Sequence, residues 1–214
     1  MKIFKNHKKG MTFIELIVVI SIFSVVAGVV LFNYRSFDES VAVQNLAQDV
    51  ALFVRSTQSE SISGVLGGSF SSGAGYGELG APSYGVFFSS ETPRRFDRFA
   101  DFSPRDGLYN PTGGITGPCP SGECIERLTI NKDTLSIKQV CAVVGATGEE
   151  DCGLDELHVL FKRPFPNGEF VCVVNDPEPV NIPCFGAKIV VGSSNPNITD
   201  RVVRIWNTGQ ISVE

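Results

Sequence analysis

A short basic leader followed by an unbroken apolar run with one carboxylate near its start constrains this chain most. The leader, residues 1–10, carries four lysines and no acidic residue, and it ends at Gly10. The run from Met11 to Phe32 contains a single ionisable side chain, that of Glu15. A run of about 20 apolar residues has the length that a membrane-spanning helix needs. A carboxylate inside hydrocarbon is costly unless it has a partner, so the sequence predicts a membrane helix in which Glu15 has a specific task.

Two simpler interpretations of this segment remain open. A secretory signal peptide has the same basic-then-apolar order, but its cleavage site follows the apolar region at small residues. The segment Ala27-Gly28-Val29 could provide such a site. A plain membrane anchor with an incidental glutamate is the second alternative. Neither interpretation gives Glu15 a role.

The complete pattern resembles the type III signal of type IV pilins and type II secretion pseudopilins; it reads Lys8-Lys9-Gly10-Met11-Thr12-Phe13-Ile14-Glu15 and continues into the apolar run. This resemblance implies that a prepilin peptidase in the membrane cuts after Gly10 and methylates the new amine of Met11. It also implies that Glu15 pairs with the Met11 amine of a neighbouring subunit, and we expect the carboxylate to be satisfied only in that assembly. The family more often has Phe than Met after the cut.

The helix is predicted to continue well beyond the apolar run. After Asn33 the apolar residues recur at spacings of three and four, which indicates one helix face turned toward a core. No proline occurs before Pro82, so one helix is predicted from Met11 to about Ser63, on the order of 80 Å long at 1.5 Å per residue. The positions expected on the core-facing side are Tyr34, Phe37, Val41, Leu46, Val50, Phe53, Val54 and Ile62.

Short apolar runs separated by turn residues follow the helix and predict antiparallel strands. The last two strands are joined by Asn207-Thr208-Gly209, which has the composition of a tight hairpin turn. The predicted strands are Tyr84–Phe88, Arg95–Phe102, Ile125–Ile130, Leu135–Val144, Leu157–Phe161, Glu169–Val174, Ala187–Val191, Val202–Trp206 and Gln210–Val213.

The predicted fold class is therefore α+β, with a long transmembrane and amphipathic helix packed on an antiparallel β-sheet, as in the pilin-like fold. Glycine and serine dominate the stretch between helix and strands, which predicts a flexible linker. The expected organisation is a leader at 1–10, a transmembrane half-helix at 11–32, an amphipathic half-helix at 33–63, a linker at 64–82 and a sheet domain at 83–214.

Two segments of the sheet domain resemble one branch of the family. The phrases Tyr84–Phe88 and Val203–Ile211 are similar to the minor-pilin class that includes the H-type pseudopilin of type II secretion and the FimT proteins. Trp206 within the second phrase is expected to be a core aromatic.

Six cysteines all lie after the predicted membrane helix. An even number of cysteines in an exported domain favours disulfides formed in an oxidising compartment. Six cysteines allow fifteen connectivities, and we favour three local bridges because each would enclose a turn-rich stretch. A zinc site is the competing interpretation, but the chain contains no Cys-x-x-Cys pair. The favoured pairs are Cys119 with Cys124, Cys141 with Cys152, and Cys172 with Cys184.

The charge balance argues against a nucleic-acid surface. The formal net charge is −5, and loss of the four leader lysines would take the side chains to −9. Phosphate binding depends largely on clustered lysine and arginine. The small group Arg94, Arg95 and Arg98 is expected to lie on a solvated strand face.

No catalytic arrangement is evident, so the chain is not predicted to be an enzyme. His158 is the sole histidine after the leader and lies within a predicted strand. No cofactor is predicted. Carboxylate oxygens could bind calcium, but neither acidic group has the regular spacing of a calcium loop, and solvated turns are favoured. The two groups are Asp97, Asp101 and Asp106, and Asp151, Asp155 and Glu156.

The leading hypothesis is a structural subunit of a type IV pilus or a type II secretion pseudopilus. The resemblance implies a bacterial inner-membrane location with a single span, the C-terminal domain outside the cytoplasm, and later incorporation into a filament. The implied partners are other pilin or pseudopilin subunits, prepilin peptidase, the inner-membrane assembly platform and membrane lipids. The alternative is a FimT-like minor pilin that binds DNA for uptake.

Overall fold

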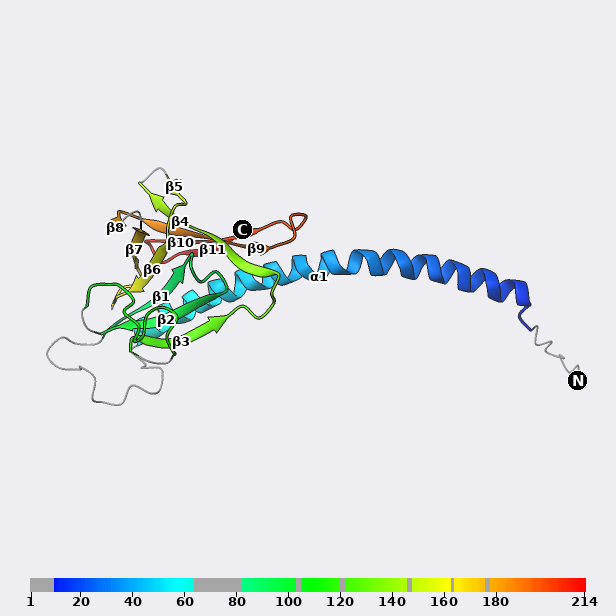
Figure 1. The fold of residues 1–214 in the computed structure, drawn as a ribbon, viewed down its shortest axis with the longest axis horizontal. Coiled ribbons are helices and arrows are strands. Elements are labelled where there is room, and N and C mark those ends of the chain that lie inside the picture. Colours follow the sequence, from blue (N-terminus) through cyan, green and yellow to red (C-terminus); the bar gives the residue numbers. More distant parts are fainter. Residues whose placement is uncertain are drawn as a thin grey trace, which may run out of the picture. The chain divides into compact units, whose positions relative to one another are not determined.

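A computed structural model describes residues 10–63, 82–102, 105–119, 122–145, 148–162, 164–175 and 178–214 (Figure 1). The predicted linker at 64–82 lies outside these residues except for Pro82, as does the leader before Gly10. The chain divides into two compact units, Met1–Glu39 and Ser40–Glu214.

Helix α1 spans Phe13–Ser63 and is the single helix of the described residues. The predicted helix is confirmed, with its start two residues later than expected. The shift arises because Thr12 occupies the capping position before the first helical residue, where its carbonyl already accepts a hydrogen bond from Leu16 N–H at 3.2 Å. The absence of proline lets the hydrogen-bonded ladder run without interruption.

The strands of the described residues form two antiparallel sheets within the second unit (Figure 1). The first sheet has the strand order β3-β2-β1-β6-β7-β8, and the second has the order β11-β10-β9-β4-β5. The strands are β1 Ser83–Ser89, β2 Arg95–Asp101, β3 Cys124–Thr129, β4 Leu135–Val144, β5 Glu149–Asp151, β6 Glu156–Phe161, β7 Gly168–Asn175, β8 Pro179–Ile182, β9 Gly186–Ser193, β10 Arg201–Trp206 and β11 Ile211–Val213.

All nine predicted strands are confirmed to within two residues at each end, and two further strands are present. Strand β5 consists of three acidic residues, and β8 begins with Pro179, so neither offers the alternating apolar pattern that marks a strand. Both lie at a sheet edge, where pairing is needed on one side alone. The α+β class is confirmed, with its strands divided between two sheets.

The main core of the second unit lies where α1 packs against both sheets. Val50 and Val54 of α1 are fully buried and share one apolar cluster with Phe161 of the first sheet and Ile189 and Ile205 of the second. Burying several aliphatic side chains of this size contributes about 1.5–3 kcal/mol each, which makes this contact the main source of cohesion between α1 and the sheets.

The face of α1 that packs on the sheets differs in part from the predicted one. Leu46, Val50, Phe53 and Val54 are buried as expected, together with three residues that the prediction did not include: Val43, Ala47 and Ala51.

The other four predicted core positions are exposed, so the prediction is wrong for Tyr34, Phe37, Val41 and Ile62. At about 100° per residue, Val41 lies roughly opposite Val43 and Val50 around the helix, although it continues the three-and-four spacing of the earlier apolar residues.

The first sheet is covered on both faces, which explains why β1 and β2 are buried without interruption. Val86 and Phe88 face the main core, whereas Phe87 packs with Phe99 and Tyr109 in a second apolar cluster on the other face. A methyl group at Gly85 would lie 2.5 Å from Cζ of Phe99, so this close approach requires glycine.

The terminal hairpin has the predicted turn. Gly209 has φ +83°, and its N–H donates to Trp206 O at 2.8 Å, while Trp206 N–H donates to Gln210 O at 2.9 Å. This geometry requires glycine at the last turn position. The expectation that Trp206 is a core aromatic is wrong, because its side chain lies next to the turn and is only half-buried.

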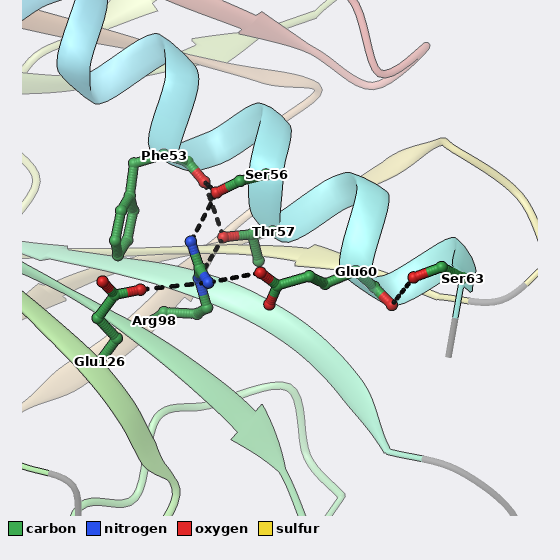
Figure 2. Close-up of polar contacts among 7 residues, drawn as sticks. All are labelled: Phe53, Ser56, Thr57, Glu60, Ser63, Arg98 and Glu126. Atoms are coloured by element: carbon green, nitrogen blue, oxygen red, sulfur yellow. Dashed lines mark hydrogen bonds and ion pairs between the residues drawn. The ribbon is translucent and has the colours of Figure 1, made fainter. Parts of the chain in front are cut away.

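The environment of Arg98 also differs from the predicted one. The sequence predicts a solvated face for Arg94, Arg95 and Arg98, but Arg98 is 8% exposed and lies between β2 and α1 (Figure 2). Alternation along β2 explains this position, because Phe96 and Arg98 point to the α1 side, while Asp97 and Phe99 point to the opposite side.

Candidate processing and assembly site

The N-terminal end of α1 carries a reciprocal hydrogen-bonded arrangement of Thr12 and Glu15. Thr12 N–H and the Thr12 hydroxyl both lie 3.0 Å from Oε2 of Glu15, and Glu15 N–H donates to Thr12 Oγ1 at 3.3 Å. This is a capping box, in which a threonine before the helix and a glutamate three residues later satisfy each other's unpaired groups. The carboxylate also lies in the first helical turn, where the helix dipole favours a negative charge.

Glu15 therefore has hydrogen-bond partners within its own chain. The expectation that this carboxylate is satisfied only by a neighbouring subunit is wrong, since Thr12 supplies two donors to one of its oxygens. Thr-x-x-Glu directly before an apolar helix is the sequence signature of this cap, although the predicted site did not include Thr12. Thr12 thus belongs to the site with Gly10, Met11 and Glu15.

Gly10 and Met11 precede the capping box and are exposed in the structure. Among the described residues, no atom lies within 4 Å of the point where a Gly10 side chain would begin. Met11 is 64% exposed. The peptide bond between these two residues is therefore open to approach by an enzyme, and packing within the described chain does not require glycine at position 10.

From Phe13 to Leu31 the large apolar side chains of α1 are exposed on all sides of the helix, and no part of the described chain buries them. By length and composition α1 could cross a membrane. Its two hydroxyl groups in this part are satisfied internally, because Ser21 Oγ donates to Val18 O and Ser24 Oγ to Ile20 O, both at 2.8 Å. Such bonds allow serine to lie in hydrocarbon without an unpaired polar group.

Comparison with known proteins adds one finding to this geometry. Residues 5–31 match the family model described as the prokaryotic N-terminal methylation motif. The matched range contains Gly10, Met11 and the whole capping box. No curated protein and no solved structure matches the chain.

The motif supports a type IV pilin-like prepilin that is processed and methylated at its N-terminus. It is typical of membrane-anchored structural proteins rather than of enzymes, and the apolar helix is consistent with such an anchor. The match ends within α1, so the two sheets carry no family assignment.

The six cysteines form the three local disulfides that the sequence favours. The structure contains the bridges Cys119–Cys124, Cys141–Cys152 and Cys172–Cys184. The competing zinc interpretation is wrong for these cysteines, because each sulfur is bonded to another sulfur. The first bridge links the end of the β2–β3 connection to the first residue of β3, the second fastens β4 to the segment after β5, and the third links β7 to the segment after β8.

His158 lies in β6, as expected, and is buried between aromatic rings. Its Nδ1 accepts a hydrogen bond from Tyr109 N–H at 3.0 Å, and its ring lies 4.9 Å from that of Phe87. This arrangement is that of a core histidine that holds the β2–β3 connection. Among the described residues, its hydrogen bond comes from a backbone N–H and not from the side chain of a nucleophile.

The acidic residues considered for calcium bind protein groups instead of converging on one point. Asp97 accepts from Arg127 and from the hydroxyl of Tyr109, and Asp155 accepts from Ser90 Oγ and Asn175 N–H. Asp101 accepts from Gly107 N–H. Within the described residues, no three acidic, histidine or cysteine side chains are placed to hold a metal ion.

Proposed function

We propose that this chain is a structural subunit of a type IV pilus or a type II secretion pseudopilus. In this proposal a prepilin peptidase cuts after Gly10 and methylates the Met11 amine. The mature subunit rests in the bacterial inner membrane through α1, with its C-terminal unit outside the cytoplasm, and enters a filament through the same helix. Its partners are other pilin or pseudopilin subunits, the assembly platform and membrane lipids.

One observation carries this proposal: a capped, uncovered apolar helix begins two residues after Met11, within the methylation motif at residues 5–31. The function of a signal peptide does not require a carboxylate fixed at the start of its apolar helix. The function of a plain membrane anchor does not require an exposed glycine before the helix. Together these features support a helix that is cut at its N-terminal end and kept.

The N-terminal mass of the protein from its native host tests the proposal most directly. We expect a chain that begins at Met11 and carries one added methyl group. A chain that begins at Met1, or after Ala27, contradicts the proposal.

The variant Gly10→Ala tests recognition of the cut site, because no described atom opposes a methyl group there. We expect the unprocessed chain to accumulate with its fold intact.

A matched pair of variants separates the charge of Glu15 from its capping role. Glu15→Gln keeps an oxygen that can accept from Thr12, since glutamine also completes a capping box, but it removes the charge. Thr12→Val keeps the charge and removes the cap. If the charge recruits the subunit, Glu15→Gln is processed but absent from filaments, whereas Thr12→Val still enters them. Normal incorporation of Glu15→Gln would refute a charge-based role.

DNA capture, the alternative function, has less support. Several basic side chains that a phosphate backbone would need are engaged in ion pairs: Lys188 and Arg204 both contact Glu150, and Arg98 and Arg127 contact acidic residues on their own sheet. The mature side-chain charge of −9 is also unfavourable for binding DNA. Salt-sensitive DNA binding by the purified protein would reverse this preference.

A further inference from the structure

Arg98 of β2 joins the last turns of α1 to the first sheet through all three of its guanidinium nitrogens (Figure 2). Its Nε donates to Thr57 Oγ1 at 3.1 Å and its Nη2 to Ser56 Oγ at 2.6 Å. Its Nη1 lies 2.8 Å from Oε1 of Glu60 and 3.2 Å from Oε2 of Glu126 on β3. The guanidinium carbon lies 4.6 Å from the centre of the Phe53 ring. Arg98 therefore contacts three successive turns of α1.

The burial of this arginine makes its contacts strong and specific. The side chain of Arg98 is 10% exposed, and that of Glu60 is 30% exposed. Removing one partner of such a pair costs far more than removing a surface ion pair, because it leaves an uncompensated charge away from water. The planar guanidinium also requires its acceptors at fixed directions, so a displaced helix could not satisfy it.

The remaining contacts of this part of α1 are directional as well. Arg55 Nη2 donates to Ile211 O at 2.9 Å, Gln58 Nε2 donates to Pro166 O at 2.7 Å, and Ser61 Oγ donates to Phe161 O at 2.6 Å. By contrast, the residues from Val43 to Val54 contact the sheets through apolar side chains. Hydrophobic contact is non-directional, so it holds a helix on a sheet without fixing its position along the helix axis.

Arg98 also supplies a positive charge that the last turn of α1 lacks. The last turn of α1 contains no basic residue, and Glu60 lies there, where the helix dipole disfavours a carboxylate. The guanidinium of Arg98 supplies the missing positive charge at this end of the helix and neutralises the Glu60 carboxylate. The end of α1 is therefore stable only in the register that brings Ser56, Thr57 and Glu60 to Arg98.

We infer that Arg98 is the positioning residue that fixes the axial register of α1 on its sheets and holds the helix against force directed along its axis. A slip of one turn moves the helix by about 5.4 Å and breaks every contact of the guanidinium with α1. The importance of this device for a filament rests on the proposed function, because a subunit held through its N-terminal helix transmits tension to its sheets through α1.

Single-molecule pulling on the full chain in detergent tests this inference, with one handle at the N-terminus and one at Glu214. We expect Arg98→Met to release α1 at constant force roughly a hundredfold faster than the unmodified chain, as expected for a broken buried ion pair. Arg98→Lys keeps the positive charge but lacks the planar guanidinium with its several donors, so we expect an intermediate rate of α1 release.

Arg127→Met is the matched control, because Arg127 is a partly buried arginine of the first sheet whose described hydrogen bonds reach Asp97 and the β2–β3 connection but not α1. We expect this control to lower overall stability without a faster release of α1. An unchanged release rate in Arg98→Met, or an equal increase in Arg127→Met, overturns the inference.

A second pair of variants covers the case in which Arg98→Met does not fold. Glu60 and Glu126 share the same nitrogen of Arg98, but Glu60 lies on α1 and Glu126 on β3. We expect Glu60→Gln to accelerate release and Glu126→Gln to leave it nearly unchanged. Equal effects would overturn the inference. Pulling requires no filament, so this result is independent of the N-terminal mass that tests the proposed function.

Discussion

The guanidinium of Arg127 donates two hydrogen bonds to the carboxylate of Asp97, from Nε to Oδ1 at 2.8 Å and from Nη2 to Oδ2 at 2.7 Å. The same arginine donates from Nη1 to Gly117 O at 2.7 Å, and the hydroxyl of Tyr109 donates to Asp97 at 3.1 Å. Burial, followed by the nearby Asp97 charge, raises the pKa of the Tyr109 phenol well above its usual range, so this hydroxyl stays a donor. The ion pair thereby holds the β2–β3 connection on the outer face of the first sheet.

Loss of this pair should destabilise the fold strongly. We expect Arg127→Met to lower the free energy of unfolding by about 3–5 kcal/mol, because the buried Asp97 carboxylate loses its counter-charge. Urea unfolding of the full chain in detergent measures the change. The double variant with Asp97→Leu should recover part of the loss, since both charges are then removed. A double variant less stable than Arg127→Met would contradict this explanation.

The ionised carboxylate of Asp101 should destabilise the folded state at neutral pH. Burial, the largest cause, raises the pKa of Asp101 above its ordinary value of 3.8, although the hydrogen bond from Gly107 N–H acts in the other direction. Between the ordinary and the raised pKa the folded chain binds more protons than the unfolded chain, so this group's contribution worsens as pH rises through that window.

The variant Asp101→Asn tests this sign. An asparagine oxygen can still accept from Gly107 N–H, and no charge is buried, so we expect the variant to be more stable than the unmodified chain at pH 7. The advantage should shrink as pH falls through the raised pKa toward 3.8. Urea unfolding at a series of pH values gives the difference curve, and a constant difference would contradict the assignment.

Glu150 should show the opposite pH dependence. The hydrogen bond from Lys188, at 2.6 Å, is the largest cause that lowers the pKa of Glu150 below its ordinary value of 4.5, and Arg204 adds to it. The stabilisation is present above pH 4.5 and is lost as pH falls through the lowered pKa.

We therefore expect Glu150→Gln to be less stable than the unmodified chain at pH 7 and to match it in strong acid. Added salt should reduce the difference at pH 7, because these three side chains are partly exposed. A difference that persists below the lowered pKa would show that packing, rather than charge, is responsible.

The Cys172–Cys184 bridge should contribute more to stability than the Cys119–Cys124 bridge. The two bridges span sequence separations of 12 and 5 residues. Loop-closure entropy predicts about 3 kcal/mol for the longer loop and about 2 kcal/mol for the shorter one. Paired Cys→Ala variants compared in urea measure the two effects, and non-reducing peptide mapping checks the pairing. The reverse order would indicate that the longer bridge strains the folded state.

Thr12 should stabilise the first turn of α1. We expect Thr12→Val to cost about 1 kcal/mol locally, because the shape of the side chain is kept but its hydroxyl is lost. Amide hydrogen exchange of the full chain in micelles should then rise at Glu15, whose N–H bonds to Thr12 Oγ1. Thr12→Ser keeps the hydroxyl and is the control. Equal protection in both variants would exclude a capping role.

The parts of the fold that the sequence predicts are those with a local signal. The predicted strands follow apolar runs between turn residues, and the bridges connect cysteines close in sequence. Strand β5 has no such signal, because Glu149–Asp151 pairs with β4 at a sheet edge without burying apolar side chains.

Arg98 could not be placed from sequence because its environment is made by residues distant in the chain. Its acceptors Ser56, Thr57 and Glu60 lie about 40 residues earlier. Alternation predicts that Arg98 shares a face with Phe96, but not that α1 brings acceptors to that face. Tyr34 and Phe37 illustrate the reverse problem, because helical spacing shows that apolar residues align without showing what they contact.

On the proposed function, the capping box affects the energetics of Glu15 when the subunit enters a filament. A subunit whose Glu15 already has partners in Thr12 can wait in the bilayer without carrying an unsatisfied charge. At Glu15, recruitment then exchanges one set of hydrogen bonds for another, so this side chain contributes little to the net free energy of each addition. An exchange of this kind is readily reversed, and on the proposed function a subunit released from a filament can return to the bilayer with its Glu15 capped again.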